Sequence, residues 1–270
     1  MTAPPLAAIA LLAAATLGYE VLLTRLFSII QWHHFAYMMI SVAMLGYGAA
    51  GTFVALSQRF LCAHFGPVFI AAAAAFGITA VAGFLIAQRI AFNPLELLWD
   101  PQQPLRLLAV YALLFVPFFC AATCVCLTFT RFGGEAHRIY ACDLGGAGAG
   151  CLGILALLFV LTPTQALIIV GMTGGVAAAA AVKPCGLSPR VLPAVLFGAV
   201  LAGALALPSD WAELHPSAYK ELSQTLAVSG MRVVAERSSP LGVVTVVESS
   251  RIPFRYAPGQ SLVSTHEPPP

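Results

Sequence analysis

Long apolar stretches alternate along the chain with short connections that contain charged and turn-forming residues. A helix that crosses a bilayer needs about 20 mostly apolar residues. Seven stretches satisfy this requirement, at about residues 5–30, 34–57, 66–87, 106–130, 139–161, 164–182 and 191–208. The pattern therefore predicts an all-α polytopic membrane helix bundle of about seven transmembrane helices, which occupies residues 1–208.

The pattern changes in residues 209–270, which carry 11 charged residues and which we expect to form a soluble tail. Residues 216–228 predict a short helix. Two runs of β-branched residues within 232–248 flank the turn-forming residues 238–242, a pattern typical of a β-hairpin. A third strand is predicted at residues 252–256, before the chain continues into a Pro-rich linker. The tail is therefore expected to be a small α+β unit built on a hairpin.

The composition agrees with a membrane protein. Hydrophobic residues make up 60% of the chain and charged residues 9%, whereas a soluble domain has about 25% charged residues. So few charges exclude a soluble globular protein, and the high hydrophobicity excludes a disordered chain. The net charge of +2 is too small to indicate nucleic-acid binding. The composition therefore predicts one partner, the lipid bilayer.

Charged residues inside the predicted spans are the first candidates for function. Glu20 and Arg25 lie in the first span and Asp143 in the fifth. A charge at the bilayer centre costs about 2.5–3.5 kcal/mol on insertion scales, so such groups usually face the bundle and find partners. Two interpretations stay open, a structural ion pair or cap and a polar substrate or proton site. His33 and His34, between the first two spans, are candidates for interfacial residues, proton carriers or ligands.

Glycines inside the spans indicate close helix packing. Residues 148–153 match G-x-G-x-x-G, but they lie within an apolar run and lack the following acidic residue that a dinucleotide loop needs. Glycines at four-residue spacing let two helix backbones approach each other in a membrane. The residues that we assign to helix packing are Gly46, Gly48, Gly51, Gly146 and Gly150.

No soluble catalytic pattern is visible. Cys120, Cys124 and Cys126 lie together in the fourth span without a neighbouring His or carboxylate, which favours packing over metal binding. The tail has no nucleophile elbow, phosphate loop or paired carboxylates. We therefore assign no catalytic residue, cofactor or metal site.

The basic residues of the connections predict an orientation. With seven spans, the N-terminal side collects Arg59, Arg131, Arg138, Lys183 and Arg190. The tail side collects Arg89, Arg106 and Lys220. Because basic residues concentrate on the cytoplasmic side, this difference of two residues favours a cytosolic N-terminus and an external tail.

Four segments together resemble membrane-fused spermidine synthase-like (polyamine aminopropyltransferase-like) proteins. Gly18–Phe27 resembles the first helix of that family, Ser41–Thr52 its Gly-rich second helix and Arg138–Gly146 its fifth helix. Glu236–Glu248 resembles the β-hairpin that precedes its catalytic domain. The resemblance extends over almost the whole chain.

The resemblance implies aminopropyl transfer from decarboxylated S-adenosylmethionine to a polyamine on a Rossmann-like domain. That domain should follow the hairpin, and the nucleotide-binding strand, Gly-rich turn and catalytic carboxylates are not among these residues. We therefore expect the membrane part of such a protein, truncated or split before its catalytic domain and inactive alone as a transferase. The resemblance also implies a bacterial inner membrane and a cytosolic tail, which we prefer to the external tail because the charge difference is small.

Two alternatives remain open from the residues alone. The bundle is a carrier for polyamines or other cations that uses Glu20, Arg25 and Asp143. Alternatively, it is a membrane scaffold whose tail pairs with a separate soluble enzyme by strand addition.

Overall fold

The computed structural model describes residues 3–31, 34–186, 214, 220–240 and 242–249. The chain divides into two units, Met1–His215 and Pro216–Pro270, and each is described by itself. The predicted seventh span at 191–208, the predicted third strand at 252–256 and His33 lie outside the described residues.

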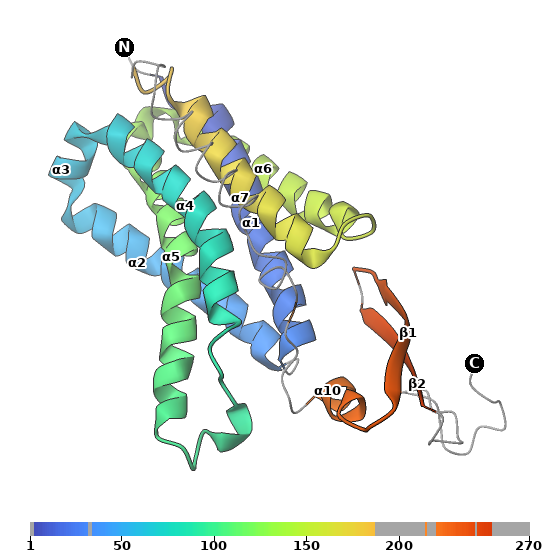
Figure 1. Cartoon of the computed structure of the whole chain (residues 1–270). Helices are drawn as coiled ribbons and strands as arrows, with labels where there is room; N and C mark the ends of the chain where they lie inside the picture. Colours follow the sequence, from blue (N-terminus) through green and yellow to red (C-terminus); the bar gives the residue numbers. More distant parts are fainter. Residues whose placement is uncertain (1–2, 32–33, 187–213, 215–219, 241, 250–270) are drawn as a thin grey trace. The chain divides into compact units, whose positions relative to one another are not determined.

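The described residues of the first unit form six helices that are long and apolar enough to cross a membrane (Figure 1). These are α1 (Leu6–Ile30), α2 (His34–Leu56), α4 (Phe65–Ala87), α5 (Gln102–Arg131), α6 (Ala136–Leu157) and α7 (Pro163–Ala181). The short helices α3 (Gln58–Ala63), η1 (Pro94–Glu96) and η2 (Gly133–Glu135) lie in the connections. The helices correspond to the first six predicted stretches, so this is a helical, multi-pass membrane protein.

Helix α1 is the centre of this unit, because it packs against α2, α5, α6 and α7. Its Tyr19 ring is fully buried and contacts Phe76 of α4 edge-on, with ring centroids 6.1 Å apart. On another side it contacts Phe118 of α5, with ring centroids 5.3 Å apart. Edge-to-face and offset aromatic pairs are favourable beyond the area that they bury. These contacts join three helices at the middle of α1.

Glycines let the helix backbones touch. A Cβ atom added to Gly146 of α6 would overlap the backbone of Ala10 in α1, and one added to Gly150 would overlap the backbone of Ala14. One turn further, a Cβ on Gly18 would lie 3.7 Å from the Cβ of Ile154. From one contact to the next, the residue number increases by four in both helices. Helices α1 and α6 therefore run in the same direction in a fixed register.

A glycine also brings α2 close to α5. Of the three glycines assigned to helix packing in α2, only Gly46 makes this contact. A Cβ on Gly46 would lie 2.6 Å from the Cβ of Phe118. Nothing lies within 4 Å of a Cβ on Gly48 or Gly51, and Gly48 instead lines a shallow apolar depression on the exposed side of α2. Each residue turns a helix by about 100°, so both positions point well away from the face that Gly46 presents to α5.

A proline sets the contact between α4 and α5. Pro117 lies inside α5 and is buried. It has no N–H to donate, so the carbonyl of Leu113, four residues earlier, loses its helical hydrogen bond. A Cβ on Gly83 of α4 would lie 2.9 Å from this carbonyl oxygen. The glycine therefore gives α4 room to approach α5 where the helix is interrupted.

The second unit contains the predicted hairpin. Helix α10 (Glu221–Leu226) precedes strands β1 (Met231–Ser238) and β2 (Val243–Ser249), which pair in an antiparallel two-stranded sheet. The turn closes with a hydrogen bond of 2.9 Å from the Ser239 N–H to the Gly242 carbonyl. An exposed ion pair of 2.7 Å joins Arg232 to Glu248 across the strands. The turn-forming residues between the strands therefore specify the hairpin.

The α1–α6 contact yields a testable prediction. Gly150→Ala should lower the free energy of unfolding in detergent by about 1–3 kcal/mol, because the added methyl group meets the backbone of Ala14 and forces the helices apart. Gly148→Ala is the matched control, since nothing lies within 4 Å of its added Cβ, and it should be neutral or slightly stabilising. Equal effects of the two substitutions would contradict the close approach.

Candidate functional site

One polar side chain, Tyr47 of α2, has electrostatic partners on three other spans. Tyr47 of α2 interacts electrostatically with Asp143 of α6, Glu20 of α1 and Cys126 of α5. Cys126 also interacts with Asp143. We call Glu20, Tyr47, Cys126 and Asp143 the polar quartet. Each is partly buried or partly exposed rather than fully enclosed.

The register of α1 and α6 separates the two acidic members. Gly146 faces Ala10, so Asp143, three residues earlier, is level with the beginning of α1. Glu20 lies beyond Gly18 and is level with the end of α6. About three turns of helix lie between the two carboxylates. They do not form one site by themselves, and Tyr47 is the residue within range of both.

Arg25 does not join the quartet. It lies five residues after Glu20, which turns it about 140° around α1. In the part of the chain that the structure describes, the side-chain ion pairs are Arg138 with Glu135 and Arg232 with Glu248. Glu20 and Arg25 are therefore not paired with each other, and a structural role of either residue through another helix stays a prediction.

The two carboxylates of the quartet lie in membrane spans and are only partly exposed. A carboxylate within the bilayer is costly as a free charge and is neutralised by a proton, a bound cation or a basic side chain. Among the described residues, no three His, Cys, Asp or Glu side chains come close enough to hold a metal ion.

His34 begins α2, and of this residue only the backbone is described. Neither His33 nor His34 can therefore be placed in the quartet. Tyr47 and Cys126 were missed as candidates by the sequence reasoning. Tyr47 was taken as part of a glycine-rich packing segment, and Cys126 as one of three packing cysteines. Their relation to Glu20 and Asp143 depends on which faces of α2 and α5 meet α1 and α6.

Cys124 fits the packing interpretation of the cysteines. Its side chain is buried, and its thiol donates a hydrogen bond of 3.4 Å to the carbonyl of Phe69 in α4. All seven cysteines are free thiols in the structure. Burial raises the pKa of the Cys185 thiol, in the turn after α7, to about 11, which makes it a poor nucleophile.

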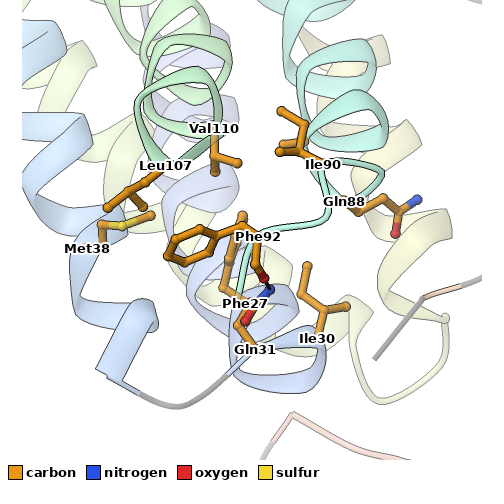
Figure 2. A pocket seen from close by; sticks show the side chains of 10 residues that line it. Phe27, Ile30, Gln31, Met38, Gln88, Ile90, Phe92, Leu107 and Val110 are labelled. Carbon is orange, nitrogen blue, oxygen red and sulfur yellow. Dashed lines mark hydrogen bonds between the residues drawn. The ribbon is translucent and has the colours of Figure 1, made fainter. Parts of the chain in front are cut away.

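A small cavity lies apart from the quartet, at the end of α1 (Figure 2). Its lining comes from α1, α2, α5 and the α4–α5 connection, and it encloses about 20 Å³. The Gln31 side chain donates a long hydrogen bond of 3.5 Å to the carbonyl of Phe92 beside it. A water molecule needs about 10–15 Å³, so this cavity has room for one water and is far too small for a polyamine.

Comparisons of the chain with models of protein families, with curated proteins and with solved structures found no match. The fold and the polar quartet thus define a class, a multi-pass helical membrane protein with polar side chains between its spans. The more specific function rests on the residues themselves and is proposed below.

The separation of the two carboxylates can be measured. In a Tyr47→Phe background, which removes the hydroxyl within range of both carboxylates, the effects of Glu20→Gln and Asp143→Asn on the free energy of unfolding in detergent should add to within about 0.5 kcal/mol, because distant residues that share no partner act independently.

The positive control for this double-mutant comparison is Tyr19→Leu with Phe118→Leu. The rings of Tyr19 and Phe118 are in contact, so these two substitutions should show a coupling of about 0.5–3 kcal/mol. A coupling of similar size between Glu20 and Asp143 would mean that the two carboxylates share one site.

Proposed function

We propose that this chain is the membrane domain of a spermidine synthase-like protein, and that its β1–β2 hairpin leads into a Rossmann-like aminopropyltransferase domain. In this proposal the membrane is a bacterial inner membrane and the hairpin is on the cytosolic side, where the aminopropyl donor is made. In this proposal the catalytic carboxylates belong to the domain that follows the hairpin, so the 270 residues alone do not transfer aminopropyl groups.

One observation carries the proposal. The segments that resemble the family coincide with the contacts that organise the bundle. Gly18–Phe27 lies on the central helix α1, and Arg138–Gly146 ends at the glycine that meets Ala10 of α1. Ser41–Thr52 contains Gly46, which contacts Phe118. Residues that determine how helices meet are the ones that a shared membrane fold would retain, and this supports a common architecture.

The hairpin gives independent support. A two-stranded hairpin is marginally stable by itself and needs further strands or a packed face. Val233, Val244 and Val246 leave 49%, 64% and 40% of their surfaces exposed. Apolar side chains on both strands are thus exposed, as expected for a hairpin that packs against a following domain.

The gene sequence after codon 270 tests this proposal. A β-strand, a Gly-rich turn and a helix should follow within one domain length, with acidic residues at the strand ends. The 270-residue chain should show no aminopropyl transfer from decarboxylated S-adenosylmethionine to putrescine, and the chain extended by this region should show it. Unrelated downstream sequence, or an extended chain without transfer, would exclude an aminopropyltransferase.

A second candidate function is supported by the polar quartet. Its members come from α1, α2, α5 and α6, and Tyr47 lies between two acidic side chains that are separated along the bundle. Polar groups spaced in this way between membrane helices are typical of proton and cation pathways. In this alternative the bundle carries a polyamine or another organic cation.

Uptake of labelled spermidine into proteoliposomes tests the carrier. Glu20→Gln and Tyr47→Phe should each reduce the initial uptake rate, because each removes a group from the pathway. Glu135→Gln is the matched control, since Glu135 lies in η2 at the beginning of the fifth span, is not a member of the quartet and pairs with Arg138. Equal rates in all of these variants, or no uptake by the unmodified protein, would exclude the carrier.

A further inference from the structure

A single buried side chain organises the connection between α4 and α5. Gln103 is completely buried, and its Oε1 accepts a hydrogen bond of 2.9 Å from the Asn93 backbone N–H. Its Nε2 donates to the carboxylates of Glu96 at 3.1 Å and Asp100 at 3.0 Å. One amide therefore joins the residue before η1, the last residue of η1 and the turn that leads into α5.

A second set of hydrogen bonds fixes the same connection from outside. Arg106 donates to the carbonyl of Ala91 at 2.7 Å and to the side chain of Gln102 at 3.0 Å. The Gln102 backbone N–H in turn donates to Asp100 at 2.9 Å. The connection is thus tied to the first turns of α5, and the positions of its side chains follow from this network.

The network presents apolar side chains outward. Leu98 and Trp99 leave 88% and 83% of their surfaces exposed. Leu105 and Leu108 continue the exposed apolar surface onto α5, a membrane span. A segment that folds around a buried polar network and still exposes a tryptophan needs a partner for that surface.

We propose that Leu98 and Trp99 insert into the headgroup region of the surrounding bilayer and that Gln103 is the positioning residue for this anchor. The connection follows Ala87, where α4 ends, and precedes Gln102, where α5 begins (Figure 1). It therefore lies at a membrane boundary, where tryptophan is enriched because its ring is apolar and its N–H is polar. Leu105 and Leu108 in the first turns of α5 are exposed as well, and the inference is independent of the proposed function.

Tryptophan fluorescence tests the anchor in the intact chain. The chain has three tryptophans, so Trp32→Phe with Trp211→Phe leaves Trp99 as the single reporter. In phosphatidylcholine–phosphatidylglycerol vesicles the emission maximum of Trp99 should lie at a shorter wavelength than that of a tryptophan exposed to water. Spin-labelled lipids should quench it more strongly with the label near the headgroup than with the label deep in the acyl chains. Emission typical of water, with no quenching by either lipid, would overturn the proposal.

The role of Gln103 is tested by a second comparison, made in the variant that has Trp99 as its single tryptophan. Gln103→Leu should increase quenching of Trp99 by aqueous acrylamide and weaken its quenching by headgroup-labelled lipids, because the connection loses the amide that holds it. Gln58→Leu is the matched control, since Gln58 is exposed in α3 and takes no part in this network. Circular dichroism checks that both variants stay helical. Unchanged quenching in folded Gln103→Leu protein would remove the positioning role, and equal changes in both variants would do the same.

Discussion

The backbone contact between α1 and α6 is the constraint on which the rest of the bundle depends. Lipid chains are as apolar as leucine, so helices in a membrane associate through close packing at small residues and not through the hydrophobic effect. Gly146 and Gly150 provide that packing against Ala10 and Ala14, and the register continues to Gly18. Because α1 also contacts α2, α5 and α7, this register determines the level at which the polar residues of every neighbouring span lie.

The remaining interfaces use the same principle with different partners. Gly77 of α4 faces Gly171 of α7, where an added Cβ would lie 2.5 Å from the Gly171 carbonyl oxygen. Gly83 of α4 faces the carbonyl that Pro117 leaves free in α5. At each of these interfaces the glycine brings one helix backbone against its neighbour.

Sequence patterns predict the parts of this structure that depend on local chemistry. Apolar runs predict the six observed spans because length and hydropathy decide membrane crossing, and the residues around Pro240 predict the hairpin turn. Glycine spacing is informative only where the face of the helix is known. Gly146 and Gly150 lie at the α1 contact, whereas Gly48 and Gly51 point away from α5 because of their angles relative to Gly46.

The polar quartet could not be derived from the sequence for a related reason. Glu20 and Asp143 are recognisable from their charge, but their separation follows from the parallel register of α1 and α6. Tyr47 and Cys126 become candidates only when α2 and α5 are placed around those helices. The presence of Glu20 and Asp143 in apolar spans therefore suggests a common site, but the register of α1 and α6 keeps the two side chains apart.

The depth of the bundle in the bilayer gives the two carboxylates different roles. Helix α5 has 30 residues, which at 1.5 Å per residue is about 45 Å and matches a bilayer of about 40–45 Å with its headgroup regions. Its two ends therefore reach opposite boundaries, with the Trp99 anchor beside the first. Glu20 lies near the middle of α1, where an unneutralised charge costs most. Asp143 is level with the beginning of α1 and lies near the opposite boundary, where the cost falls. Glu20 is thus the member of the quartet at which an unneutralised charge would cost more.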